Sequence, residues 1–255
     1  DIFASAPPRL TAAGFGDLMG NYIALADAQI AALITGRPIN HKLFAAELLA
    51  MKKVIEQLDD LAAGNPSVCE QLLFALILPD MEIGFYNAAR PLMGAEHHLS
   101  RYLDISVEQP RLDAVHGEKV GIGTLLCLKA YEHFKTALKN HQLIPAAHYP
   151  SAAKEIRKGF WNTEVREAVT LLNTPDPLAN ITGEQVLAHE KEILEILDEL
   201  PSSHDIEICF QKMGCKTMIE ELGIGDDMIR LAMIYSPYVS HDITLLRLMK
   251  LFENH

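Results

Sequence analysis

Apolar residues recur at helical spacing along nearly the whole chain, and this periodicity constrains the fold more than any other feature. In the segment 41–63 they return every three to five positions, as Leu43, Ala46, Leu49, Val54, Leu58 and Leu61. Such spacing is typical of a helix with one buried face. Residues 64–67 (GNPS) end this segment, and Ser67 is placed to cap the next helix.

The same reasoning predicts helices through most of the remaining chain. The predicted segments are 22–33, 67–78, 120–138, 162–172, 183–200, 206–222, 226–232 and 240–252. Each is long for a strand and lacks the alternation of a half-buried strand. The sequence therefore predicts an all-α fold, one helical array over residues 1–255 without internal repeats.

Composition and charge exclude several classes of protein. With 34 acidic residues against 22 Lys and Arg, the net charge is −12, and 49% of the chain is hydrophobic. Basic residues are scattered, which argues against nucleic acid or an anionic membrane surface as a partner. The apolar runs 71–78 and 121–128 are much shorter than the roughly 20 residues of a membrane span, so we expect no membrane insertion.

The cysteines and the first residues predict the setting of the chain. Four cysteines without a Cys-x-x-Cys pair are typical of reduced thiols, which predicts a cytoplasmic protein. No signal-peptide pattern is visible at the start. Because the chain begins with Asp1 rather than Met, we expect it to be part of a longer protein.

The chain contains no nucleotide-binding motif. Its three Gly-x-Gly pairs, at 14–16, 121–123 and 223–225, lack the third glycine of a dinucleotide fingerprint, and there is no P-loop lysine. A nucleotide used by this protein would have to be bound by residues outside this sequence.

Two histidines and one aspartate form a candidate metal site. His97 lies where a buried helix is expected to begin, His116 opens the apolar helix that follows, and Asp17 lies in a stretch of small residues. Two imidazoles and a carboxylate suit a catalytic divalent ion. Taken singly, Asp17 could be a helix N-cap, His97 a hydrogen-bonded core histidine, and His116 a first-turn histidine bonded to a carbonyl.

The surroundings of these three residues resemble a known family. The stretches 14–27 (GFGDLMGNYIALAD), 89–97 (ARPLMGAEH) and 116–125 (HGEKVGIGTL) are similar, in order and approximate separation, to three motifs of sn-glycerol-1-phosphate dehydrogenases. That family belongs to a superfamily with glycerol dehydrogenase, the iron-type alcohol dehydrogenases and dehydroquinate synthase. The resemblance is weaker between 36 and 86 and from 129 to 224, and the closing segment 240–248 is only loosely similar.

The resemblance implies the helical, metal-binding C-terminal domain of a two-domain enzyme whose N-terminal α/β domain binds NAD(P)H. It assigns Asp17, His97 and His116 as ligands of a divalent metal, with zinc the first candidate and nickel or iron as alternatives. The metal would act as a Lewis acid on the ketone of dihydroxyacetone phosphate, and hydride transfer would give sn-glycerol 1-phosphate. A small phosphorylated ketone is thus the expected partner, in a homo-oligomer, and the isolated chain is expected to be inactive.

Other positions refine this expectation. Asn21 lies one helical turn after Asp17 and is expected to bind substrate, whereas Asp27 lies on another face and is expected to be structural. Where the family resemblance predicts a second histidine and a tryptophan, the chain has Arg101 and Ala28. Arg101 could hold the phosphate, could indicate a changed substrate or lost activity, or could simply be an exposed arginine at a helix end.

Asp17 favours the phosphate-substrate dehydrogenase, because dehydroquinate synthases have Glu where this chain has Asp17. Two alternatives to this interpretation stay open. A different metal-dependent polyol dehydrogenase or sugar-phosphate cyclase is the alternative among enzymes. A non-catalytic helical module derived from such an enzyme is the alternative outside them.

Overall fold

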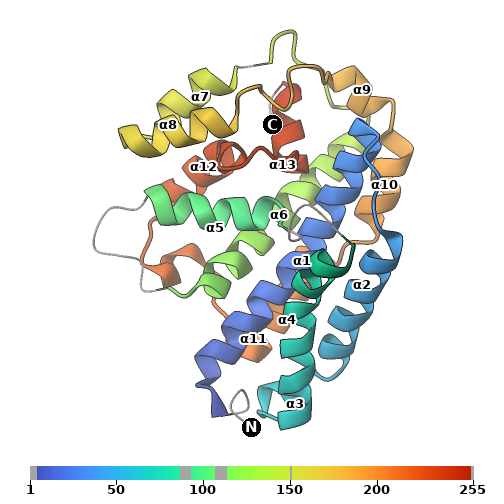
Figure 1. The fold of residues 1–255 in the computed structure, drawn as a ribbon, viewed down its shortest axis with the longest axis vertical. Helices are drawn as coiled ribbons and strands as arrows, with labels where there is room; N and C mark the ends of the chain where they lie inside the picture. The colour runs from blue at the N-terminus through green and yellow to red at the C-terminus, as the bar shows by residue number, and fades with distance from the viewer. Residues whose placement is uncertain (1–4, 87–92, 107–113, 150, 254–255) are drawn as a thin grey trace.

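The computed structural model describes residues 5–86, 93–106, 114–149 and 151–253, apart from the side chains of 80–86. Helices make up its secondary structure, and its only β-type pairing is an isolated bridge between Pro145 and Phe252. The predicted all-α class is confirmed (Figure 1).

The helices follow one another in short steps along the chain. In order they are α1 (Pro8–Thr35), α2 (His41–Glu56), α3 (Leu58–Ala62), α4 (Pro66–Tyr86), α5 (Ala95–Ser106), α6 (His116–Lys139), α7 (Ala152–Gly159), α8 (Thr163–Leu172), α9 (Gly183–Leu187), α10 (Glu190–Asp198), α11 (Ser203–Met213), η2 (Ile219–Leu222), α12 (Asp226–Tyr235), η3 (Ser236–Tyr238), α13 (Leu245–Leu248) and η4 (Met249–Leu251).

Several predicted segments are shorter or more broken than the sequence suggested. The segment 41–63 divides at Gln57, whose side chain donates both to the carbonyl of Lys53 and to Gln71 Oε1 on α4. The segment 183–200 divides between α9 and α10, 206–222 stops at Gly214 in the left-handed region (φ 71°), and 240–252 forms only short helical turns. The predicted cap at Ser67 is wrong, because α4 starts at Pro66 and the Ser67 N–H donates to Asn65 Oδ1.

Helix α1 is the central element. It runs for 28 residues, so the small-residue stretch before Tyr22 is part of the helix and not a lead into it. Its length and composition would suffice to cross a membrane, yet 61% of its most apolar window is buried inside the protein. Burial of this kind is typical of a core helix. It ends at Gly36 (φ 69°), whose N–H donates to the carbonyl of Ala32.

Glycines let α1 and α6 approach each other closely. A Cβ at Gly117 would lie 2.0 Å from the Ala13 carbonyl oxygen, and one at Gly16 would lie 2.8 Å from the Gly117 carbonyl oxygen. Gly121 packs against Gly16 in the same contact. Glycines of two of the Gly-x-Gly pairs therefore serve backbone packing between helices.

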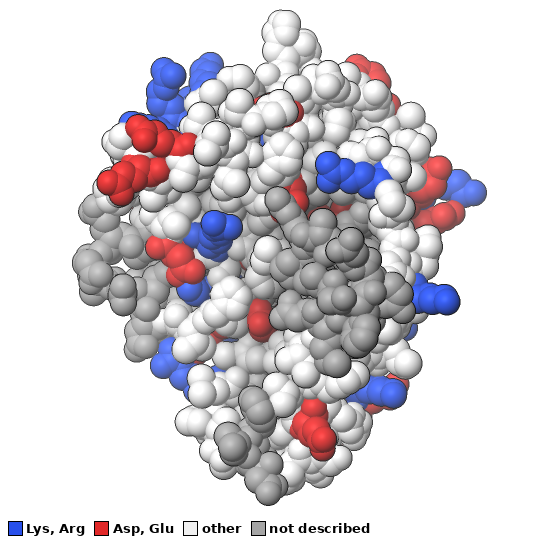
Figure 2. All heavy atoms as spheres, in the orientation of Figure 1, with Lys and Arg blue, Asp and Glu red and all other residues white. Residues whose placement is uncertain are grey.

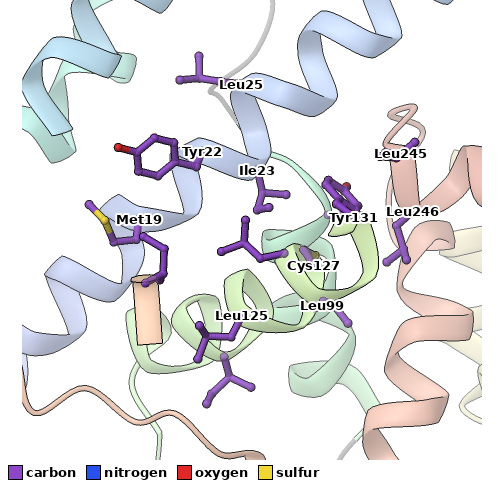
Figure 3. Packing of buried hydrophobic residues seen from close by; sticks show 14 of the residues in the cluster. Met19, Tyr22, Ile23, Leu25, Leu99, Leu125, Cys127, Tyr131, Leu245 and Leu246 are labelled. Atoms are coloured by element: carbon purple, nitrogen blue, oxygen red, sulfur yellow. The ribbon is translucent and has the colours of Figure 1, made fainter. Parts of the chain in front are cut away.

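The core surrounds this helix pair (Figure 3). Ile23 of α1, Leu99 of α5, Leu125 and Tyr131 of α6 and Leu245 of α13 are all nearly or fully buried. Each of the helices α1, α5 and α6 thus contributes a buried face. The packing of these faces against one another fixes the relative positions of the three helices, and with them the polar side chains that the helices carry.

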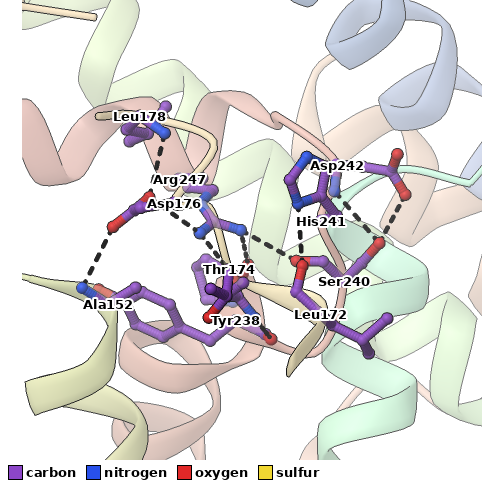
Figure 4. A network of polar contacts seen from close by, with 12 residues as sticks. Ala152, Leu172, Thr174, Asp176, Leu178, Tyr238, Ser240, His241, Asp242 and Arg247 are labelled. Atoms are coloured by element: carbon purple, nitrogen blue, oxygen red, sulfur yellow. Dashed lines mark hydrogen bonds and ion pairs between the residues drawn. The ribbon is translucent and has the colours of Figure 1, made fainter. Parts of the chain in front are cut away.

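A buried arginine fixes the C-terminal segment (Figure 4). The fully buried Arg247 donates to the carbonyls of Pro237 and Ser240 and to Asn173 Oδ1, and its Nη2 lies 3.5 Å from Asp176 Oδ1. Its guanidinium also stacks 5.4 Å from the ring centroid of Tyr238. These contacts join α13 to the loop after α8.

The visible surface carries mixed charge. In Figure 2 lysine and arginine side chains are dispersed among acidic ones over the face shown. The four cysteines are free thiols. The expectation that the protein has no nucleic-acid partner stays a prediction.

Candidate metal centre

The three predicted ligands, distant in sequence, converge at one place. Asp17 comes from the middle of α1, His97 from the first turn of α5 and His116 from the first residue of α6. One ligand atom of each lies within 4.8 Å of the others. The close α1–α6 contact at Gly16 and Gly117 places Asp17 beside His116, because each glycine is the immediate neighbour of one of them.

The spacing of these atoms suits a shared cation better than direct hydrogen bonds. Asp17 Oδ1 lies 3.5 Å from His97 Nε2 and 3.6 Å from His116 Nε2. These separations exceed those of good N–H···O hydrogen bonds. Two ligands of a tetrahedral zinc ion lie about 3.3–3.4 Å apart, given bonds of about 2.0–2.1 Å.

Asp17 Oδ1 supports the same interpretation. It is buried and has no hydrogen-bond partner among the described residues. A buried carboxylate oxygen without a donor is costly. A divalent cation at this point would supply the missing partner, so the residues present fit a metal ion.

A second carboxylate orients His97 from behind. Glu96 is fully buried, and its Oε1 lies 2.7 Å from His97 Nδ1 while also accepting a 2.9 Å hydrogen bond from the Gly94 N–H. Because Nδ1 faces Glu96, the other ring nitrogen, Nε2, points toward Asp17. Metal-bound histidines usually have such a partner on the second nitrogen.

The protonation of the site reflects burial and these neighbours. Burial raises the pKa of Asp17 above its ordinary value, against the opposing charges of His97 and His116. Burial tends to lower the pKa of His97, but the hydrogen bond and charge of Glu96, with the charge of Asp17, leave it raised. Burial lowers the pKa of His116, which Asp17 only partly offsets.

The end of α6 that carries His116 is held by a further acidic residue, Glu118. Glu118 accepts the Val115 N–H, a double contact from the Arg9 guanidinium at 2.7 and 2.9 Å, and an ion pair from Lys216 at 3.1 Å. Burial acts to raise the pKa of Glu118, but the Arg9 and Lys216 contacts lower it to about 2. The carboxylate therefore stays charged and anchors this helix end.

The site opens toward His116. The side chain of His97 is 16% exposed and that of Asp17 29%, whereas that of His116 is 58% exposed. A ligand arriving from solvent would reach the ion from the His116 side. The N-cap alternative for Asp17 is wrong, because this residue lies in the interior of α1.

The two predicted substrate residues differ in their surroundings. Asn21 is buried one turn after Asp17, and its Nδ2 donates to Glu47 Oε2 on α2 at 3.3 Å. Arg101 is exposed one turn after His97, and no described residue forms an ion pair with it. Of the second motif, residues 89–92 lie outside the described part of the chain.

Two neighbouring polar residues do not join the site. His98 is buried on another face of α5, and neither ring nitrogen has a hydrogen-bond partner among the described residues. Asp27 accepts hydrogen bonds from the N–H groups of Ala95 and Leu245 and from the Tyr131 hydroxyl. Asp27 therefore joins α1, α5, α6 and α13, as its expected structural role requires.

Sequence reasoning missed the functions of Glu96 and Glu118. Glu118 follows Val115 by three residues, the spacing of a helix N-terminal capping glutamate, and this signal was available. The contact of Glu96 with the adjacent His97 has no sequence signature, because it depends on the Gly94 N–H and on the close packing of Gly94 and Gly123 around Glu96.

Known proteins share extended similarity with this chain. No protein-family model matches it. Curated relatives include the glycerol-1-phosphate dehydrogenases of Halalkalibacterium halodurans, 26% identical over 229 residues (89% of this chain, 49% of the relative), and Aeropyrum pernix, 32% over 191 residues (74% and 52%). The enzyme of Pyrococcus abyssi is 30% identical over 191 residues (74% and 53%).

These relatives have NAD(P)+ in their names. The chain spans about half the length of the curated relatives it matches. Its helical fold agrees with the helical C-terminal domain that the motifs imply. The chain is therefore a homologue of the glycerol-1-phosphate dehydrogenases, matching them over a helical portion of about half their length.

Proposed function

We propose that this chain is the metal- and substrate-binding part of an NAD(P)-dependent oxidoreductase that reduces dihydroxyacetone phosphate to sn-glycerol 1-phosphate. The observation that carries this proposal is the meeting of Asp17, His97 and His116 around a buried carboxylate oxygen without a donor. The homology to glycerol-1-phosphate dehydrogenases supplies the reaction class.

The protein's own residues define how the site would work. Asp17, His97 and His116 would hold the divalent ion, with zinc the first candidate and nickel or iron the alternatives. An ion held there would supply Lewis-acid chemistry toward a ketone oxygen. The side chains of Asp17 and His97 are partly covered by the protein, and the more exposed His116 side would admit the substrate.

Two residues would orient the substrate. Arg101 lies one turn from His97 on the same side of α5, and its guanidinium has no ion pair with a described residue. A phosphate matches its planar fork of donors. Asn21 is held by Glu47 one turn after Asp17, so it would define one wall of the site.

The nicotinamide cosubstrate would be held outside this chain. The described residues are helical, and the two glycine pairs at 14–16 and 121–123 pack helices together. We propose that the dehydrogenase acts in the cytoplasm as a homo-oligomer, and that the chain alone does not turn over substrate.

A metal-binding experiment tests the proposal at its foundation. Wild-type protein, freed of metal and titrated with Zn²⁺, Ni²⁺ and Fe²⁺ against a chromophoric chelator, should bind one ion. His116→Ala and Asp17→Asn should each lose at least tenfold in affinity, while His241→Ala, a remote histidine that contacts the Leu172 carbonyl, should bind like the wild type. Absence of a stoichiometric ion would favour the non-catalytic module.

Substrate choice separates the two enzyme alternatives. NAD(P)H oxidation should be followed with the chain joined to the nucleotide-binding half of a homologue, using dihydroxyacetone phosphate and unphosphorylated ketones. A preference for the phosphorylated ketone that Arg101→Met reduces would support the proposal. Equal rates with both would favour another polyol dehydrogenase.

A further inference from the structure

The two histidines of the metal centre are supported differently. His97 has a carboxylate on its second ring nitrogen, 2.7 Å from Glu96 Oε1. No described residue forms a hydrogen bond with the ring of His116, and its side chain is 58% exposed. One imidazole is therefore fixed before an ion arrives, and the other is free to adjust.

Glu96 itself is held rigidly. Its side chain is fully buried, and Oε1 also accepts the Gly94 N–H at 2.9 Å. A Cβ at Gly94 would lie 2.6 Å from Glu96 Oε2 and 2.8 Å from the Cα of Ala24, so no larger residue fits behind the carboxylate. On the other side, a Cβ at Gly123 would lie 2.7 Å from the Glu96 carbonyl oxygen, so α6 packs directly against its backbone.

This arrangement selects one form of the imidazole. A carboxylate accepts hydrogen bonds only, so the ring nitrogen that faces Glu96 has to carry the hydrogen. In neutral His97 that places the hydrogen on Nδ1 and leaves the lone pair of Nε2 free. Nε2 is the atom that lies 3.5 Å from Asp17 Oδ1.

We propose that Glu96 is a positioning residue that fixes His97 in the Nδ1–H tautomer and in the ring orientation that binds metal. This inference rests on the proposed metal site and adds an order to its assembly. Asp17 and His97 form a preorganised pair, and His116 closes on the ion from the exposed side.

Two variants test the role of the carboxylate. Glu96→Ala removes the acceptor, and loss of such an outer partner typically costs about 10–100-fold in metal affinity. Glu96→Gln keeps an oxygen acceptor of the same length, so we expect it to recover most of that loss. The readout is the Zn²⁺ dissociation constant of the purified chain, measured by competition with a chromophoric chelator.

A matched control separates positioning from general destabilisation. Glu132→Ala removes a carboxylate that accepts the N–H and hydroxyl of Ser203, sixteen residues along α6 from His116. That distance is about 24 Å in a helix. Glu132→Ala should weaken the fold and leave Zn²⁺ affinity unchanged.

The tautomer of His97 provides a second measurement, which would not change if Glu96 had only a structural role. In ¹⁵N–¹H spectra of the metal-free protein, with His97 assigned by its loss in His97→Gln, the wild type and Glu96→Gln should show the hydrogen on Nδ1. Glu96→Ala should show a tautomer mixture. This measurement stands on the wild type even where Glu96→Ala does not fold.

Three outcomes would overturn the inference. They are wild-type Zn²⁺ affinity in Glu96→Ala, an Nε2–H tautomer of His97 in the wild type, or an equal loss of affinity in Glu132→Ala. If wild-type protein binds Zn²⁺ and the Glu96 variants bind equally well, the positioning role fails and the metal site stands. If wild-type protein binds no metal, the proposed function fails as well.

Discussion

The candidate metal centre and the Arg247 cluster both place a charged atom out of contact with water, but they differ in whether the protein supplies its hydrogen-bond partner. Arg247 is surrounded by acceptors from Pro237, Ser240 and Asn173, and only its Nε lacks a partner among the described residues. At the metal centre Asp17 Oδ1 is left without a donor, and the nearest nitrogens lie 3.5 and 3.6 Å away. A buried charged group that has hydrogen-bond partners within the protein stabilises the fold. A buried carboxylate oxygen that lacks a donor and lies beside two imidazoles indicates instead a binding site for a cation.

Removing the charge of Arg247, which is hydrogen-bonded within the protein, should have the largest effect on stability. Arg247→Met leaves buried acceptors without their donor, and breaking a buried charged network costs about 3–5 kcal/mol. We expect a loss of that size in the free energy of unfolding, measured with urea, and no change in the Zn²⁺ affinity of protein that remains folded. Arg101→Met, at an exposed position on α5, is the control and should change the unfolding free energy by about 0.5 kcal/mol or less. A loss below about 1 kcal/mol for Arg247→Met would contradict the structural role of the cluster.

Disrupting the close contact between α1 and α6 at Gly117 should have the second-largest effect on stability. Gly117→Ala places a Cβ where the Ala13 carbonyl oxygen lies 2.0 Å away, so α6 has to move away from α1. Overpacking of this kind costs about 1–3 kcal/mol, and the movement should also separate His116 from Asp17 and weaken Zn²⁺ binding. Gly14→Ala meets only side-chain methyl groups, of Leu76 at 3.3 Å and of Leu72 at 3.8 Å, and serves as the control. Equal Zn²⁺ affinity in the two variants would show that this contact does not set the site.

Glu118, which anchors the start of α6, should contribute a smaller and pH-dependent amount to the free energy of unfolding. The pKa of Glu118 is lowered to about 2 against an ordinary value of 4.5, so its contribution is full above about pH 4.5 and is lost as the pH falls toward 2. Glu118→Gln should lower the unfolding free energy by about 1 kcal/mol at pH 7, and the difference from wild type should shrink below pH 4.5. A difference that is constant between pH 7 and pH 3 would exclude this linkage.

Removing the charge of Asp17 should have the smallest effect on the stability of the metal-free protein, and it should stabilise the protein rather than destabilise it. Burial raises the pKa of Asp17, so its charged form weakens the metal-free protein once the pH exceeds the ordinary value of 3.8. At pH 7 Asp17→Asn should leave the unfolding free energy unchanged or raise it by up to about 1 kcal/mol, while Zn²⁺ no longer stabilises the protein. A clear destabilisation without metal would mean that Asp17 is structural, like Arg247.

The sequence was informative where local pattern and chemistry agree. Helical periodicity predicted the class, and the motifs around Asp17, His97 and His116 singled out three candidate ligands whose ligand atoms the structure places within 4.8 Å of one another. The division of 41–63 at Gln57 was not predictable, because Gln57 bonds to Gln71 on another helix. Tertiary contacts of this kind override local preference.

The same limit applies to Glu96, whose contact with His97 depends on the Gly94 N–H and on the packing of Gly94 and Gly123 around it. The Gly-x-Gly pairs show the converse. They do not form a nucleotide motif, and it is the distance between two helices that explains Gly16 and Gly121.

The contact of Gly117 with the carbonyl of Ala13 bears on ion selectivity. Backbone against backbone leaves no flexible side chain to yield, so the gap between the carboxylate of Asp17 and the ring of His116 has a lower limit fixed by the main chain. This limit does not exclude a larger ion, because the exposed side chain of His116 can move outward. An ion such as calcium, which takes six to eight oxygen ligands at about 2.3–2.6 Å, would be disfavoured by the two imidazole donors instead. We therefore expect selectivity against hard cations to come from the imidazole donors, while the helix contact limits only how closely Asp17 and His116 can approach each other.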